Sequence, residues 1–487
     1  MSSINTSSST TTHEFKQSLG LLDATMIVVG SMIGSGIFIV SADITRSVGS
    51  AVWLILVWIL TGVLTLTAAL SYGELSGMYP KAGGQYVYLK EAFNPLVGFL
   101  FGWSFFAVIQ AGSIAAVGVA FAKFTAYIFP ALSERRIILD AGAIQVSAAQ
   151  LTSILLIVAL TWINSRGVKG GKWIQTTFTL AKIIALAGLV IFGFLLAASP
   201  NYRDVAAANW SAGFRLGQLD AGQLLPYTGM AALGAIAGSM VGSLFSSDSW
   251  NNVTFIAGEI KRPQRNIGLS LFLGTLIVTI IYVAANLMYI SVMPMQAIAS
   301  AENDRVGVAA SQLIFGARGT IIIAVLLMIS TFGCNNGLIL SGARVYYTMA
   351  RDGLFFRQAG VLNKRAVPAK ALWMQCLWAS LLCLSGKYGE LLDYVIFVVL
   401  IFYILTIIGI FRLRKSKPYL PRPYRAFGYP VLPAIYIVLA SCICLLLLIY
   451  KPKYTWPGLG IVLAGIPLYH FLRGRAISTR RPRYDID

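Results

Sequence analysis

Long apolar runs recur from residue 22 almost to the end of the chain, and each could cross a lipid bilayer. A spanning helix needs about 20 mainly apolar residues. Such runs cover residues 22–45, 51–78, 96–129, 148–165, 173–197, 229–258, 267–293, 319–350, 370–386, 388–411, 430–450 and 455–472. A soluble core could not absorb them, because 57% of the residues are hydrophobic and only 11% are charged. The sequence therefore predicts an all-α, polytopic membrane protein with about twelve transmembrane helices.

The distribution of lysine and arginine predicts how the chain is oriented. If the N-terminus is cytoplasmic, inner loops carry 26 of the 38 basic residues and outer loops carry 10. The positive-inside rule then places both termini in the cytoplasm and the chain in the plasma or inner membrane. The net charge of +20 follows from this topology. We expect no nucleic-acid partner, because the basic residues are spread over short loops.

Beyond the spans, the sequence predicts one membrane domain over residues 21–473. A polar tail at 1–20 and a basic tail at 474–487 flank it, both cytoplasmic. The N-terminus lacks the basic region of a cleaved signal. All five cysteines fall within predicted spans without metal-ligand spacing, and the two histidines lie near the chain ends. We therefore predict no metal, no cofactor and no enzymatic activity.

Two of the runs are interrupted by small and polar residues. The first contains VGSMIGSGIF at 29–38, in which Gly30 and Gly34 also fit a helix-packing motif. The sixth contains GSMVGSLFSSDSWNNVTF at 238–255, with four polar residues in a row at 246–249. Interrupted helices at corresponding positions of two halves are typical of a transporter site near the membrane midplane. Because such an interruption occurs in two runs, the pattern favours a transport site over a role in helix packing alone.

Such breaks have a specific chemical use. Unwinding exposes backbone N–H groups at the positive start of one half-helix, where a carboxylate binds. It also exposes carbonyl groups at the end of the other half-helix, which accept an ammonium group. A pair of broken helices thus suits both charged groups of an α-amino acid, and glycine permits the unusual backbone angles.

Several motifs together identify a resemblance to a known superfamily. They are GSMIGSGIF at 30–38, YGELSGMYPKAGGQYVYL at 72–89, AKIIAL at 181–186, GEIKRPQRNIGLS at 258–270, TFGCNNGLILSGARVYYTMARDGLF at 331–355 and RPYRAFGYPVLP at 422–433. The chain resembles the amino acid–polyamine–organocation superfamily, and within it the L-type amino acid transporters and their bacterial relatives. The resemblance implies a leucine-transporter-type inverted repeat with discontinuous helices one and six. The repeats would cover about 21–197 and 229–411, followed by two extra helices at about 430–472.

The resemblance also implies which residues hold the substrate. The site would comprise Met32, Gly34, Ser35, Gly36, Ile37, Phe245, Ser246, Ser247 and Asp248. Amides of the first break would bind the carboxylate, and carbonyls of Phe245, Ser246 and Asp248 would bind the amine. Phe245 would also act as an aromatic gate. Ser247 stands where eukaryotic members often have an aromatic residue, which changes the size of the pocket.

Lys182 and Asp248 are ionisable residues within predicted spans. A lysine in mid-membrane costs about 2.5–3.5 kcal/mol on insertion scales and needs partners. Lys182 could be a packing residue bound by carbonyl groups, or its ammonium could replace a sodium ion. The resemblance places that site beside Gly30, in contact with helices one and eight. Asp248 could brace the broken helix, couple transport to protons, or pair with a cationic substrate.

The resulting hypothesis is a sodium-independent secondary transporter that exchanges neutral L-amino acids by alternating access. The alternative is proton-coupled uptake of an amino acid, or uptake of a cationic amino acid or polyamine. A channel would need a filter loop, and a receptor would usually add a soluble domain. The expected partners are an amino acid and membrane lipid. Animal relatives attach a heavy chain through a cysteine between helices three and four; residues 130–147 contain none, so no disulfide-linked heavy chain is expected.

Overall fold

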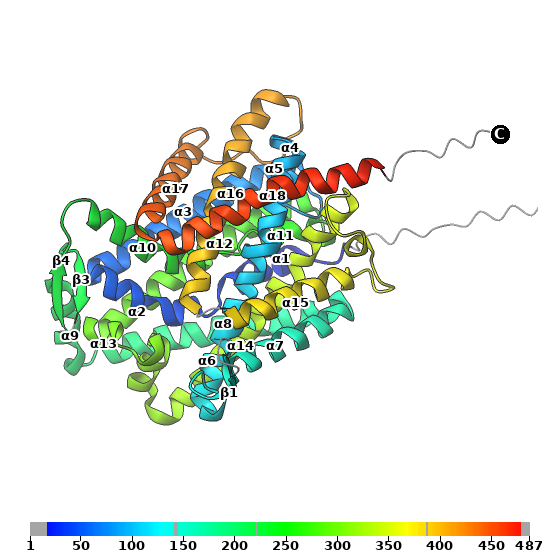
Figure 1. Cartoon of the computed structure of the whole chain (residues 1–487). Helices are drawn as coiled ribbons and strands as arrows, with labels where there is room; N and C mark the ends of the chain where they lie inside the picture. The colour runs from blue at the N-terminus through cyan, green and yellow to red at the C-terminus, as the bar shows by residue number, and fades with distance from the viewer. Residues whose placement is uncertain (1–16, 141–144, 221, 386–387, 479–487) are drawn as a thin grey trace, which may run out of the picture.

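The computed structural model describes residues 17–140, 145–220, 222–385 and 388–478 as a bundle of helices with two small β-hairpins (Figure 1). Most of the two predicted tails, residues 1–16 and 479–487, lies outside the described residues. The α-helices are α1 (Leu21–Met32), α2 (Gly36–Val48), α3 (Ala51–Met78), α4 (Gln85–Ala92), α5 (Pro95–Ser104), α6 (Gln110–Ile128), α7 (Ala148–Ser165), α8 (Val168–Ala197), α9 (Pro200–Ser211), α10 (Met230–Ser246), α11 (Asn252–Phe255), α12 (Pro263–Val292), α13 (Met295–Ala299), α14 (Val306–Arg351), α15 (Ala369–Ser385), α16 (Tyr388–Ser416), α17 (Val431–Tyr450) and α18 (Pro452–Ser478). The strands are β1 (Ile137–Asp140), β2 (Gln145–Ser147), β3 (Gly217–Asp220) and β4 (Gln223–Pro226).

The helices confirm the polytopic all-α class, although not the count of twelve spans. In the described part of the chain, nine helices are long and apolar enough to cross a membrane. Helices α1 and α2, bent by 41° at their junction, make a tenth span if they count as one. The predicted spans at 229–258 and 370–386 correspond to α10 and α15. Both helices are apolar, but they are shorter than a helix that crosses a membrane.

Local sequence signals explain where several spans begin. Helices α3 and α7 coincide with the predicted runs at 51–78 and 148–165. Ser147 and Gln150 form a capping box at the start of α7, each side chain bonding the other's backbone N–H. The predicted run at 96–129 is continuous but contains a π-helical turn at Phe105–Ile109.

The described part of segment 198–226, which lies between two of the predicted spans, forms a folded cap. It forms α9 and the antiparallel β3–β4 hairpin at the left of Figure 1. The buried Asn209 side chain donates to the carbonyls of Ile290 and Met293 at 2.7 and 2.8 Å and accepts from the Met295 amide at 3.0 Å. These bonds fix α9 to the end of α12. We call the side of the bundle with α9 and β3–β4 the cap end, and the opposite side the termini end.

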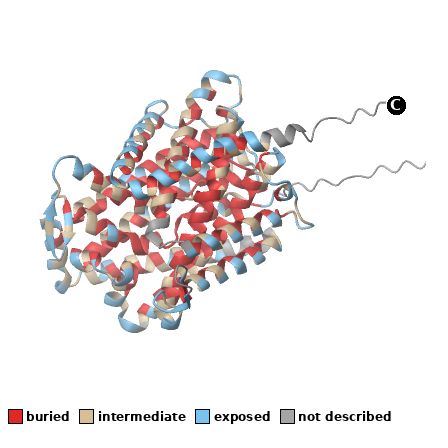
Figure 2. Cartoon of the chain, viewed as in Figure 1, coloured by how far each residue is buried: buried red, intermediate tan, exposed pale blue. Residues whose placement is uncertain are grey.

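Burial follows the expected arrangement of a membrane bundle. Buried residues fill the middle of the bundle, whereas exposed residues gather on its outside (Figure 2). Large apolar side chains such as Leu155, Ile184 and Leu195 are more than 60% exposed on their helices. An apolar exterior of this kind is suited to lipid.

The start of the described chain is docked onto the bundle. Ser18 and Leu19 donate backbone hydrogen bonds to the Glu259 carbonyl at 2.9 and 3.0 Å, and Lys261 donates to the Leu19 carbonyl at 2.8 Å. Leu19 is buried. The last residues of the predicted tail at 1–20 are therefore part of the folded bundle.

Candidate substrate site

The first predicted break lies where the sequence placed it. Helix α1 ends at Met32, α2 begins at Gly36, and residues 33–35 between them are not helical. Ile33 is extended, with φ −71° and ψ 94°. The first N–H groups of α2, including those of Gly36 and Ile37, have no acceptor within their own helix. They form the positive helix start that a carboxylate would need.

The second break is real, but the helix after it is shorter than a half-span. Helix α10 ends at Ser246, residues 247–251 are irregular, and α11 contains only four residues. Local bonds compete with a longer helix here, since Thr254 donates its hydroxyl to the Asn251 carbonyl at 2.7 Å. The Gly83 amide also bonds the Phe255 carbonyl at 3.1 Å. The expected discontinuous helix six is thus one long helix followed by single turns.

The two breaks lie against each other. A Cβ atom added to Gly36 would lie 2.6 Å from the Ser246 Cβ, which is closer than real side chains approach. One turn nearer the cap end, a Cβ atom on Gly242 would lie 2.9 Å from the Val40 Cβ. Glycine at positions 36 and 242 is therefore what allows α2 and α10 to touch.

Tyr282 of α12 joins the two breaks and was missed by the sequence interpretation. Its hydroxyl lies 3.0 Å from the carbonyl oxygens of both Met32 and Ser246, to which it can donate its proton. A tyrosine within an apolar run was the available signal, but the sequence could not say what it faces. The buried hydroxyl holds the end of α1 beside the end of α10.

Two of the three carbonyl groups predicted to bind the amine, those of Phe245 and Ser246, already have partners in the protein. The Phe245 carbonyl accepts from the Asp248 amide at 3.1 Å, and the Ser246 carbonyl lies beside Tyr282. A carbonyl oxygen has two lone pairs and can accept a second donor. Phe245, Ser246 and Ser247 are all buried.

Lys182 is fully buried and bonded to the first break. Its ammonium donates to the carbonyls of Gly30 and Ile33, both at 2.6 Å, and lies 3.5 Å from the Ser330 carbonyl. Gly30 and Ile33 belong to the end of α1, and Ser330 belongs to α14, the eighth predicted span. The ammonium therefore holds the negative end of α1, as a bound cation would.

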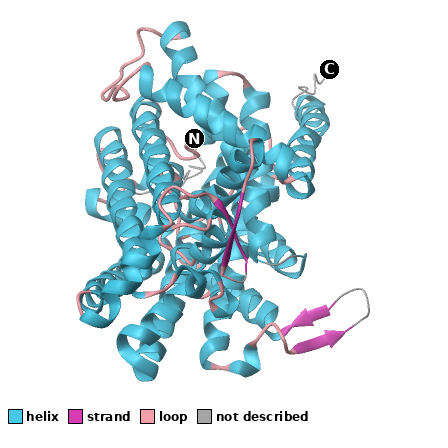
Figure 3. Ribbon diagram, turned by 90° about the vertical axis from the view of Figure 1, so that its left-hand side faces the viewer, coloured by secondary structure: helices cyan, strands magenta, loops and turns pink. Residues whose placement is uncertain are grey.

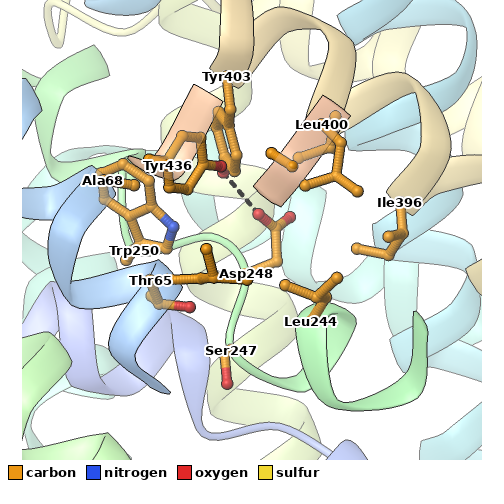
Figure 4. Close-up of a pocket in the computed structure, with 13 residues that line it drawn as sticks. Thr65, Ala68, Leu244, Ser247, Asp248, Trp250, Ile396, Leu400, Tyr403 and Tyr436 are labelled. Carbon is orange, nitrogen blue, oxygen red and sulfur yellow. Dashed lines mark hydrogen bonds between the residues drawn. The ribbon is translucent and has the colours of Figure 1, made fainter. Parts of the chain in front are cut away.

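Asp248 points toward Tyr403 of α16 (Figure 4). Its carboxylate accepts from the Tyr403 hydroxyl at 2.6 Å and from the backbone of Ser249. It lines a cavity of about 20 Å³, enough for one water molecule. The lining residues come from α3, α10, α16, α17 and the break after α10, and none comes from α1 or α2. This geometry favours the bracing role over a contact with a cationic substrate.

A cleft of about 380 Å³ opens toward the cap end above the two breaks. Its lining includes Ile39 and Val40 of α2 and Val241 and Gly242 of α10. This size is in the usual range for small-molecule sites. The contact between Val40 and Gly242 separates the cleft from the deeper contact between Gly36 and Ser246.

Ion pairs close the termini end of the bundle. Glu259, after α11, pairs at 3.0 Å with Arg344 of α14, and both side chains are buried. Glu74 of α3 accepts from Arg414 at 2.7 and 3.0 Å. Glutamates near helix ends can either form a gate or belong to a solvated surface. Their burial and pairing favour the gate, because breaking a buried pair costs about 3–5 kcal/mol.

Comparisons with known proteins agree with this geometry. A family model described as amino acid permease matches residues 19–463. The chain is 30% identical to the large neutral amino acids transporter small subunit 2 of Mus musculus, over 93% of this chain and 80% of that protein. It is 28% identical to the Asc-type amino acid transporter 1 of Mus musculus, over 93% and 81% of the two chains, and 29% identical to the b(0,+)-type amino acid transporter 1 of Homo sapiens, over 95% and 88%. This multi-pass membrane protein, a transporter and not an enzyme, therefore belongs to the amino acid permease family.

Proposed function

We propose that this chain is a sodium-independent secondary transporter that exchanges neutral L-amino acids across the plasma or inner membrane. The observation that carries the proposal is the junction of the two breaks. The start of α2 lies against the end of α10, where Gly36 contacts Ser246. The Tyr282 hydroxyl lies 3.0 Å from the carbonyl oxygens of Met32 and Ser246. The names of the relatives, which specify amino acids, support the substrate class.

The substrate would lie between the breaks, with its carboxylate on the amides of Gly34, Ser35, Gly36 and Ile37 beside Met32. Its ammonium would face the carbonyls of Phe245, Ser246 and Asp248. The close packing of Gly36 on Ser246 means that α2 and α10 must separate to admit it. Phe245 would cover the bound substrate, and the small Ser247 would leave room in the pocket.

Alternating access would use the two closed ends of the bundle. With both termini in the cytoplasm, the cleft beside Val40 and Gly242 faces outward and the Glu259–Arg344 pair faces inward. The proposed repeats at 21–197 and 229–411 would move against each other. Separation of α2 from α10 opens the outer path, whereas rupture of the ion pairs opens the inner path.

We expect purified protein in liposomes to exchange amino acids without sodium. Lys182 already places a positive charge on the Gly30 and Ile33 carbonyls, so a sodium ion there would be repelled. Uptake of labelled neutral amino acids should rise when unlabelled substrate is inside and stay unchanged when choline replaces sodium. A large loss in choline would contradict sodium independence, and absence of trans-stimulation would contradict exchange.

The same assay tests the alternative of proton coupling. Asp248 is a buried carboxylate whose oxygen accepts from Tyr403, which is the observation that favours this second candidate. A pH gradient across liposomes without internal substrate should drive accumulation if protons are coupled. Equal uptake with and without the gradient would contradict proton coupling and would indicate that Asp248 braces the broken helix.

We also expect a single chain to be sufficient for transport. The segment between α6 and α7 has no cysteine through which a heavy chain could be linked. Liposomes that contain only the purified chain should therefore show the full exchange rate measured in cell-derived membranes. A rate that appears only after a second protein is added would contradict this expectation.

A further inference from the structure

The β1–β2 hairpin presents an unusual apolar strand to its surroundings. Ile137, Ile138 and Leu139 are consecutive and are 43%, 55% and 56% exposed. An ordinary surface strand alternates apolar and polar side chains, so a run of exposed aliphatic residues indicates a contact outside the chain. On the other strand, Val146 and Ser147 are buried, so β1 is the outer strand.

The hairpin is placed where a membrane boundary lies. Ile137 pairs with Ser147, the residue before α7, and the Ala148 amide donates to the Arg136 carbonyl at 2.8 Å. Helix α7 is one of the nine helices in the described part of the chain that can span a membrane, and it begins at Ala148. The start of β1 is therefore level with the start of a span.

The hairpin also extends in the right direction. Figure 3, which looks onto the cap end, shows β1 and β2 projecting sideways beyond the outline of the bundle, whereas β3 and β4 lie over its middle. Lipid surrounds the sides of a membrane bundle, so a sideways projection at the start of a span meets lipid before it meets water.

The charges beside the strand fit the same surroundings. Arg135 and Arg136, both exposed, directly precede β1, whereas the acidic residues Glu134 and Asp140 lie on either side of this segment. Basic residues beside apolar ones suit the phosphate groups of anionic phospholipids. The outer edge of β1 carries backbone polar groups that require hydration, which excludes the hydrocarbon centre and favours the headgroup boundary.

From these observations we propose that the β1–β2 hairpin is a lipid-binding element, which inserts Ile137, Ile138 and Leu139 into the headgroup boundary beside α7 with Arg135 and Arg136 on anionic phosphates. The competing occupant is a second copy of the chain, paired along the free edge of β1. The bilayer is favoured because the strand lies level with the start of a span and projects toward the surrounding lipid.

Site-directed spin labelling of the full chain tests the proposal. The label is placed by Ile138→Cys, with Cys442→Ser to remove the exposed native thiol, whereas the other four cysteines are buried. The matched control is Gln218→Cys, an exposed strand position on β3. In phosphatidylcholine vesicles, the label at 138 should collide mainly with oxygen, which concentrates in lipid, and the label at 218 mainly with a water-soluble nickel chelate.

A second arm tests the charges. Phosphatidylglycerol in the vesicles should move the label at 138 deeper, and Arg135→Gln with Arg136→Gln should abolish that shift. Preference for the nickel chelate at 138, or dipolar broadening between labels on two chains, would overturn the proposal. An unchanged shift in the double variant would overturn the role given to the arginines.

Discussion

Replacing Lys182 with methionine should abolish amino acid exchange while leaving a folded protein. The ammonium makes two hydrogen bonds of 2.6 Å to carbonyls at the end of α1, and a charged hydrogen bond contributes about 1.5–3 kcal/mol. Loss of both would destabilise the arrangement that positions the break by at least about 3 kcal/mol, which lowers its population about 150-fold. Transport is measured as the initial exchange rate per folded transporter in liposomes.

The control for this prediction lies two residues away. Leu180 is on the same helix but is 51% exposed on the outside of the bundle, so Leu180→Met should exchange at the parent rate. Monodisperse elution and an unchanged melting temperature would show that Lys182→Met is folded. An exchange rate equal to that of the parent would mean that Lys182 is only a packing residue.

The second large effect is expected at Gly36, where valine should remove substrate binding. Valine would fill the space that opens between α2 and α10 to admit the substrate, because even in the closed packing its Cβ would lie 2.6 Å from the Ser246 Cβ. Overpacking of this severity costs about 3 kcal/mol, or about 150-fold in affinity. A β-branched side chain would also crowd the carboxylate at the start of α2. Binding is measured by scintillation proximity on the purified, folded fraction.

Two controls separate a binding site from simple packing. A valine at Gly30, which lies in α1 before the break, should lower affinity less than Gly36→Val. The double variant Gly36→Ala with Ser246→Gly should recover part of the affinity that Gly36→Ala loses, because it restores the missing space. Esters and amides of the substrate should compete poorly at the parent site. Normal affinity in folded Gly36→Val would show that the break serves packing and that the proposed site is wrong.

The class of the protein and the position of its breaks follow from the sequence alone. Membrane spans are encoded locally, because about 20 apolar residues and the caps beside them decide where a helix crosses. This is why the limits of α3 and α7 match their apolar runs. The break at residues 33–35 is favoured locally as well, because the glycines at positions 34 and 36 lower the helix propensity there.

Contacts between distant parts of the chain were decided only by the tertiary structure. Tyr282 reaches Met32 across 250 positions, and Asp248 meets Tyr403 across 155. An apolar or polar pattern records which side of a helix is buried, but not which helix covers it. The partners of Glu74 and Glu259 were unpredictable for the same reason.

Lys182 shows how the two kinds of information combine in this protein. Its cost in a membrane is readable from the sequence, which therefore determined that the ammonium must have partners. The sequence could not choose between packing and function, because carbonyl groups are present on every helix. The fold supplies the partners by unwinding the chain at residues 33–35, which leaves the carbonyls of Gly30 and Ile33 to accept from the ammonium. In an intact helix, those carbonyls would accept hydrogen bonds from backbone N–H groups of the same helix.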